Sequence, residues 1–139
     1  MNATHSLQCP CGEISMEISG PPQCQMFCHC EDCRSLHGGG TLGLAIFAAG
    51  DFRLTKGVPA AWTLRKVARQ HCPTCGTRLF AHLPEMGLTM VFATLLPEGM
   101  FRPEFHIHCL GAVLPVADAL PHYKDMPAVF GGSGECVAW

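Results

Sequence analysis

The stretch that decides the fold is QMFCHCEDCRSLHGGG, residues 25–40, which places three cysteines and a histidine within the six positions from Cys28 to Cys33. Side chains two positions apart on extended backbone face the same side, so Cys28 and Cys30 present both thiols to one region. Two sulfurs about 3.8 Å apart suit a tetrahedral zinc with Zn–S bonds of about 2.3 Å. A disulfide within such a short loop would be strained. We therefore interpret this stretch as a metal-binding segment.

The bulk composition describes a compact globular chain. Its 139 residues fit a single domain over 1–139, and 48% hydrophobic against 14% charged residues argues against disorder. The net charge of -2 provides no basic field for nucleic acid. The apolar runs are far shorter than the roughly 20 residues of a membrane span, and the first residues lack a secretory signal. We expect a cytoplasmic protein that binds neither nucleic acid nor membrane.

Ten cysteines are the unusual feature of the composition. In a cytosolic chain, clustered cysteines indicate metal ligands or catalytic thiols rather than a disulfide framework. Seven of them fall into three clusters: Cys9 and Cys11; Cys28, Cys30 and Cys33; Cys72 and Cys75. The last cluster, CPTCG, has the pattern of a zinc knuckle, in which proline stiffens the turn and glycine permits a left-handed residue after the second ligand.

The number seven carries information because a tetrahedral zinc takes four ligands. One site can close with four thiolates, and the remaining three thiolates leave a coordination position open, which is typical of a working site. The spacing does not say which pairs join. Two pairs closing one site and the triple holding the other is the simplest division, and it predicts two zinc ions per chain.

Short alternating segments predict a mainly β fold with one or two short helices. Fifteen glycines and eleven prolines are scattered along the chain and leave little room for long helices. Strands are expected at residues 13–18, 52–55, 62–65, 79–82 and 88–92. A short helix is expected over Glu31–Leu36, and residues 115–123 are expected to add a helical turn or two.

The order C-x-C-G, C-H-C-x-x-C, C-x-x-C-G resembles the family of glutathione-dependent formaldehyde-activating enzymes, which also includes centromere protein V. Further similarity lies in the segments 75–79, 101–107 and 120–123, so the resemblance covers residues 7–123. It implies a zinc-anchored β-tent of small antiparallel sheets. It also implies a structural zinc on four cysteines and a catalytic, open zinc on three. The structural ligands would be Cys9, Cys11, Cys72 and Cys75, and the catalytic ones Cys28, Cys30 and Cys33.

Three thiolates around a dication leave a net charge near -1, which makes the metal a weak Lewis acid with a preference for a further soft ligand. An incoming small thiol fits that preference. The reaction that the resemblance implies is formation of S-hydroxymethylglutathione from glutathione and formaldehyde, with the reverse step a carbon–sulfur lyase reaction. We expect a zinc-dependent enzyme of this type whose partner is glutathione or another small thiol.

Two other classes are considered. A non-catalytic zinc module would serve as a thiol carrier or a protein-interaction domain, and a nucleic-acid version of it would need a basic patch that the chain lacks. A nucleobase deaminase is suggested by His29-Cys30-Glu31, but the helical P-C-x-x-C half of that signature is missing.

Several residues near the triple are candidates for other roles. Arg34 is the candidate clamp for a substrate carboxylate, and His37 is a candidate for carboxylate binding or general acid catalysis. His29 lies between two ligands, so its side chain should face away from them and form hydrogen bonds. The cysteines outside the clusters are expected to fill core space. They are Cys24, Cys109 and Cys136. For Cys136, near the end of the chain, the alternative is an exposed thiol that can be oxidised.

Overall fold

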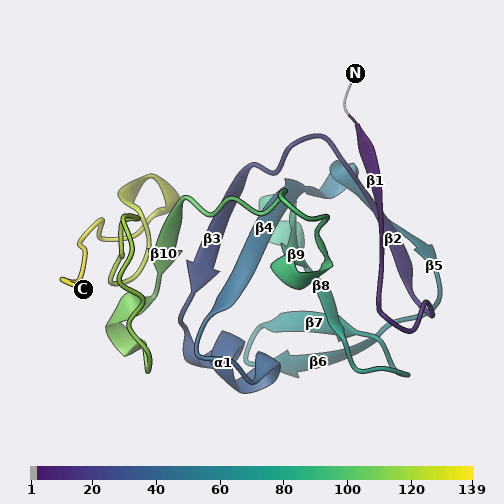
Figure 1. The fold of residues 1–139 in the computed structure, drawn as a ribbon, viewed down its shortest axis with the longest axis horizontal. Helices are drawn as coiled ribbons and strands as arrows, with labels where there is room; N and C mark the ends of the chain where they lie inside the picture. Colours follow the sequence, from purple (N-terminus) through teal and green to yellow (C-terminus); the bar gives the residue numbers. More distant parts are fainter. Residues whose placement is uncertain (1–2) are drawn as a thin grey trace. The chain divides into compact units, whose positions relative to one another are not determined.

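The computed structural model describes residues 3–139, which divide into two compact units. The first comprises the described residues up to Cys24 together with Ala45–Phe101, and the second comprises Gln25–Leu44 together with Arg102–Trp139. Ten strands, one α-helix and five short 3-10 helices make up the described chain (Figure 1). The 3-10 helices are η1 (Ala49–Asp51), η2 (Pro84–Met86), η3 (Ala93–Leu95), η4 (Cys109–Gly111) and η5 (Ala128–Phe130). The predicted mainly β fold is confirmed, and the single-domain assignment over 1–139 stays a prediction.

One sheet of the first unit is a three-stranded antiparallel sheet. Its strands, in sheet order, are β1 (Thr4–Gln8), β2 (Ser15–Ser19) and β5 (Phe52–Lys56). Along β2, buried Met16 and Ile18 alternate with half-buried neighbours, which is the period of two that the sequence predicted. The turn between β1 and β2 contains Gly12 in the left-handed region at φ 79°, and the Gly12 N–H donates to the Cys9 carbonyl.

Five other strands of the first unit form a run of neighbours. In order they are β4 (Leu42–Ala48), β9 (Leu88–Phe92), β8 (Arg78–Leu83), β7 (Val67–His71) and β6 (Ala60–Leu64). The pairs β9–β8, β8–β7 and β7–β6 are antiparallel, and β4 belongs to this unit from Ala45 onward. The predicted strands of this region are confirmed within two residues at each end.

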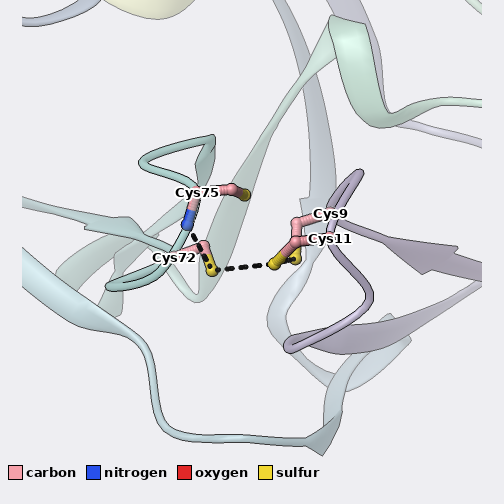
Figure 2. Close-up of side chains that lie close together, drawn as sticks. All are labelled: Cys9, Cys11, Cys72 and Cys75. Carbon is pink, nitrogen blue, oxygen red and sulfur yellow. Dashed lines mark hydrogen bonds between the residues drawn. The ribbon is translucent and has the colours of Figure 1, made fainter.

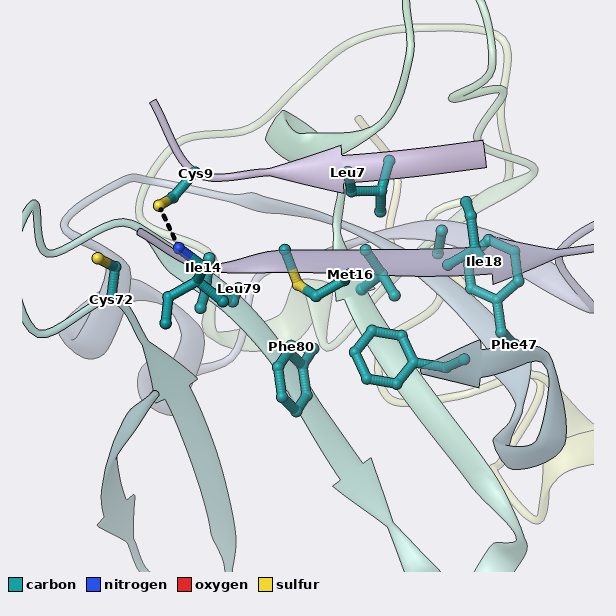
Figure 3. Close-up of a cluster of buried hydrophobic side chains, with 12 residues drawn as sticks. Leu7, Cys9, Ile14, Met16, Ile18, Phe47, Cys72, Leu79 and Phe80 are labelled. Atoms are coloured by element: carbon teal, nitrogen blue, oxygen red, sulfur yellow. Dashed lines mark hydrogen bonds between the residues drawn. The ribbon is translucent and has the colours of Figure 1, made fainter. Parts of the chain in front are cut away.

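The core of the first unit is built from the inward faces of these strands (Figure 3). Met16 and Ile18 face Phe47 and Phe80, and each such fully buried side chain contributes about 1.5–3 kcal/mol of transfer free energy. Two cysteines, Cys9 and Cys72, belong to the same buried cluster, and both are fully buried. The rest of the cluster consists of Leu7, Ile14, Ala45, Phe52, Leu79 and Val91. The buried core of the first unit therefore includes one cysteine from each of the two pairs, Cys9 and Cys72.

The second unit contains the opening cysteine stretch. Its elements are β3 (Cys24–Cys28, in this unit from Gln25), α1 (Glu31–His37) and β10 (Phe105–Ile107). The strand β10 pairs with β3 in parallel, with Phe27 opposite His106, so this one pairing departs from the expected antiparallel arrangement.

The helix α1 confirms the expected helix over Glu31–Leu36 and extends it by one residue. Cys30 is its N-cap, and the Cys33 N–H donates to the Cys30 Sγ at 3.3 Å. Glu31 and Asp32 lie in the first turn, where negative charge is favourable, and Gly38 ends the helix in the left-handed region at φ 71°. A sulfur atom thus caps the N-terminus of this helix.

The expected helical turns over residues 115–123 are wrong. The segment is irregular: an Asp118 carboxylate oxygen accepts the Leu120 N–H at 3.0 Å, and His122 and Tyr123 form isolated bridges instead. Short polar side chains that bond nearby backbone groups compete with helix formation, and prolines at both ends of the segment remove donors. No helix in the described part of the chain is long and apolar enough to cross a membrane.

Candidate metal centres

Four cysteines of the first unit bring their sulfur atoms together (Figure 2). Cys9 and Cys11 come from the loop after β1, and Cys72 and Cys75 come from the loop after β7. All four Sγ atoms lie within 4.8 Å of one another, with Cys9 to Cys11 at 3.5 Å and Cys11 to Cys72 at 3.7 Å. Four sulfurs around a tetrahedral zinc would be about 3.8 Å apart. The spacing of the thiols therefore fits zinc.

Hydrogen-bonding groups lie next to three of the four sulfur atoms of this group. The Ile14 N–H donates to the Cys9 Sγ and the Cys75 N–H to the Cys72 Sγ, each at 3.4 Å. The Thr77 hydroxyl lies 3.2 Å from the Cys75 Sγ, and its hydrogen bond is the main cause that lowers the pKa of Cys75 to about 6. Hydrogen bonds to the charged form are what a thiolate ligand requires.

The second group consists of Cys28, Cys30 and Cys33 in the second unit. Cys28 ends β3, Cys30 caps α1, and Cys33 lies one helical turn further on, so three adjoining pieces of backbone bring the thiols within 4.8 Å of one another. Hydrogen bonds from Cys28 and Cys33 lower the pKa of Cys30 far below its ordinary value, and hydrogen bonds with Cys30 and Cys33 raise the pKa of Cys28. One thiolate is thus stabilised by two thiols.

The two groups differ in the number of ligand atoms. Among the described residues, no fourth cysteine, histidine or carboxylate atom joins the group at Cys28. Cys28 and Cys33 are buried and Cys30 is half-buried, so the group is reached from the Cys30 side. Both groups have the soft donors and the spacing that zinc takes, one as a set of four and the other as a set of three.

The remaining thiols lie outside both groups. None of the ten cysteines, all of which lie in the described part of the chain, forms a disulfide. Cys109 is buried, and burial raises its pKa to about 11, whereas Cys24 is half-buried and Cys136 is exposed. Core filling thus describes Cys109 well, whereas Cys136 agrees with the alternative of an exposed thiol.

The two candidate substrate contacts lie on α1. The Arg34 Nε donates to the His29 carbonyl at 3.0 Å, which fixes the guanidinium beside the helix start. His37 is the last helical residue and is half-buried. Both residues share the short helix with Cys33, and their contact with substrate stays a prediction.

A third group of possible ligands was missed from the sequence. His106, Asp118 and His122 offer ligand atoms that lie within 4.8 Å of one another in the second unit. From the sequence, His106 was expected to be a hydrogen-bonded strand residue and His122 lay in a segment that resembles the family. Nothing singled out Asp118, because the three positions have no local spacing pattern. Burial opposes ionisation of Asp118, but hydrogen bonds from His106 and from the Leu120 N–H outweigh it and lower the pKa of the carboxyl.

His29 connects to this third group. Its side chain is fully buried, and its Nε2 lies 2.9 Å from the His106 Nδ1, in agreement with the expectation that it forms hydrogen bonds. Burial is the main cause that lowers the pKa of His29 to about 4, so the ring is neutral at physiological pH.

Comparisons with known proteins agree with the cysteine pattern. A family model described as glutathione-dependent formaldehyde-activating enzyme matches residues 4–110. The crystal structure of a Rhodobacter sphaeroides protein, 20% identical, has a similar fold with a TM-score of 0.55 over 68% of this chain and 89% of that chain. No curated protein shows significant similarity to the sequence. The chain belongs to the glutathione-dependent formaldehyde-activating enzyme family.

Proposed function

We propose that this protein is a zinc-dependent carbon–sulfur lyase or synthase that acts on the adduct of glutathione, or of another small thiol, with an aldehyde. With formaldehyde the adduct is S-hydroxymethylglutathione. The carbon–sulfur bond forms between the thiol sulfur and the carbonyl carbon, and the thiol proton ends on the carbonyl oxygen. Family membership supports the choice of glutathione and formaldehyde.

The observation that carries the proposal is the set of three thiols at Cys28, Cys30 and Cys33, all within 4.8 Å of one another. A zinc ion held there supplies an open coordination position for a thiol sulfur. Because three thiolates reduce the charge of the site to about -1, a soft sulfur suits that position better than water does. The partial exposure of Cys30 leaves a route for a small molecule to reach the group.

The four-cysteine group serves a structural role in this proposal. Cys9 and Cys72 are fully buried parts of the core, and the set of four thiols completes a tetrahedral site without a position for substrate. The proposed stoichiometry for the two thiol groups is therefore one zinc each.

Arg34 and His37 are the proposed contacts to the substrate. Arg34 is oriented by the His29 carbonyl, and a guanidinium so placed matches a carboxylate, of which glutathione carries two. His37 stands at the end of the same helix and is proposed to donate the proton that the carbonyl oxygen receives.

Binding is tested by calorimetry with glutathione in buffers of different ionisation enthalpy. The zinc-loaded protein should release about one proton per thiol bound, because the thiol ionises when its sulfur becomes a ligand. The Cys33→Ser variant should lose this release, and Cys136→Ser, which removes an exposed thiol outside both groups, should retain it. Absence of binding by any small thiol would defeat the proposal and favour a non-catalytic zinc module.

Catalysis needs a separate measurement because glutathione and formaldehyde also combine unaided. Magnetisation-exchange spectroscopy at equilibrium should show faster interconversion of adduct and free thiol with the wild type than with Cys33→Ser. Proton-coupled binding without faster exchange would identify a thiol carrier instead.

A further inference from the structure

We propose that His106, Asp118 and His122 form an additional metal site, distinct from both cysteine groups, which binds a divalent first-row transition metal through two imidazoles and one carboxylate. The His106 Nε2 lies 2.8 Å from Asp118 Oδ2, and the His122 Nε2 lies 3.0 Å from Asp118 Oδ1. One carboxylate thus faces two ring nitrogens, one with each of its oxygens. This is the arrangement of a two-histidine, one-carboxylate metal site.

The unusual atom in this group is the His122 Nε2. It is buried and has no hydrogen-bond partner among the described residues, although a carboxylate oxygen is only 3.0 Å away. The ring nitrogen is therefore close to the oxygen without being aligned for a hydrogen bond. A buried polar atom without a hydrogen bond is unfavourable, and a shared metal ion would give this nitrogen a partner.

His106 already has the support that a metal-binding histidine normally has. Its second ring nitrogen, Nδ1, lies 2.9 Å from the His29 Nε2, so the ring orientation is fixed by a partner on the far side from Asp118. The His106 side chain is fully buried. The Thr41 hydroxyl in turn lies 3.4 Å from the His29 Nε2 and donates to the Cys28 carbonyl. These contacts form an outer shell behind the proposed ligand.

The surroundings would exclude water on one side and admit an ion on the other. The Trp139 ring packs against the rings of His122 and His106, with centroid separations of 4.8 and 6.0 Å. The Asp118 side chain is 33% exposed, whereas that of His122 is only 8% exposed. The carboxylate thus marks the entry side of a site whose other ligands are covered.

The distances also fit a small rearrangement on metal binding. Ligand atoms around a tetrahedral ion with bonds of about 2.1 Å lie about 3.4 Å apart. The two nitrogen–oxygen pairs, at 2.8 and 3.0 Å, need to separate by only about half an ångström, which a rotation of the Asp118 side chain provides.

The ligand set predicts a metal of different character from the one at the thiols. Two neutral imidazoles and one carboxylate leave a dication with a net charge near +1, and nitrogen and oxygen donors suit iron(II), nickel(II), cobalt(II) or zinc. The proposed ion would be a much stronger Lewis acid than a zinc surrounded by three thiolates.

The test uses Co²⁺ added to full-length protein that already carries two equivalents of zinc, so that the thiol groups are filled. One further equivalent should bind and give weak ligand-field absorption in the visible range, without the intense near-ultraviolet charge-transfer band of sulfur-bound cobalt. In Asp118→Asn and His122→Gln this binding should weaken at least about 100-fold, because loss of even an outer-shell partner typically costs 10–100-fold. His82→Gln is the matched control, since His82 is hydrogen-bonded to Thr89 in the first unit.

Two results would overturn the proposal. The first is wild-type protein that takes up no third equivalent. The second is a third equivalent that Asp118→Asn binds as tightly as the wild type does. Neither result touches the thiol site, because glutathione binding at Cys28, Cys30 and Cys33 is read out by proton release and not by cobalt absorption.

Discussion

The order of stability of two serine variants separates a metal-linked fold from ordinary packing. Cys75 is exposed, whereas Cys33 is 2% exposed. If the thiols were only packed side chains, Cys33→Ser would destabilise the protein more, because it buries a hydroxyl in place of a sulfur. If Cys75 is a ligand of a structural zinc, Cys75→Ser should be the more damaging change.

The size of each loss of stability follows from the length of the chain segment between the cysteines that a metal ion would join. The four-cysteine group joins Cys11 to Cys72, which are 61 positions apart. By the loop-closure relation used for cross-links, holding such a loop removes about 4 kcal/mol of entropy from the unfolded chain. The group at Cys28–Cys33 spans five positions, for which the same relation gives about 2 kcal/mol.

We expect Cys75→Ser to cost about 2–4 kcal/mol of unfolding free energy, since three remaining ligands hold zinc less tightly than four. For a chain of this length that corresponds to a fall of about 7–14 °C in Tm. The Tm of Cys33→Ser should fall by less than that of Cys75→Ser.

The assay is thermal unfolding followed by circular dichroism on zinc-loaded protein, repeated after treatment with a chelator. After zinc removal the order of the two variants should follow burial, with Cys33→Ser the less stable. If zinc-loaded Cys33→Ser melts below zinc-loaded Cys75→Ser, the assignment of the structural and open sites is inverted.

Two further predictions concern the backbone and a loop. Gly57 has φ 85°, and a Cβ there would lie 2.5 Å from the Glu13 carbonyl oxygen, whereas Gly87 has a similar φ but open space around it. Gly57→Ala should therefore lower the free energy of unfolding by about 1–3 kcal/mol more than Gly87→Ala does, as measured by denaturant titration. The Asp125 carboxylate accepts the Ser133 hydroxyl at 2.8 Å and the Ser133 N–H at 3.0 Å, and these bonds lower its pKa, so Asp125→Ala should speed amide exchange at Ser133. The stability that the ionised Asp125 contributes is present above the ordinary carboxyl pKa and is lost as the pH falls through the lowered pKa. The exchange rates of wild type and Asp125→Ala should therefore become equal at that low pH, and equal rates at neutral pH would contradict the prediction.

The sequence predicted what depends on local spacing. The strand over residues 88–92 and the start of α1 at Glu31 were predicted to the residue, because the residue composition of a short run is a local pattern. The grouping of the thiols was also accessible, since ligands two or three positions apart are constrained to converge. The count of seven suggested sets of four and three, but the joining of Cys9 and Cys11 to Cys72 and Cys75, about 60 positions away, came from the family resemblance.

The third group depends on contacts that local patterns do not encode. The His29 and His106 rings meet only because β10 pairs in parallel with β3, across 77 positions of chain. Asp118 reaches His106 from a segment that we expected to be helical. The wrong helix and the missed ligand have the same cause, because the Asp118 carboxylate accepts the Leu120 backbone N–H with one oxygen and contacts the His106 ring with the other. Such a residue is identified only when the tertiary structure is known.

One short stretch serves both candidate centres of the second unit because extended backbone alternates its side chains. Cys28 and Cys30 contribute to the thiol group, while His29, between them, contacts His106 through Nε2. Phe27 and His29 are also two positions apart, and both of their rings stack on the ring of His106. The histidine between the ligands therefore has a structural reason to be there that is independent of the thiols. His29 contacts His106 through its ring and lies between two thiol ligands in the chain, so it is the residue through which the two centres would be coupled.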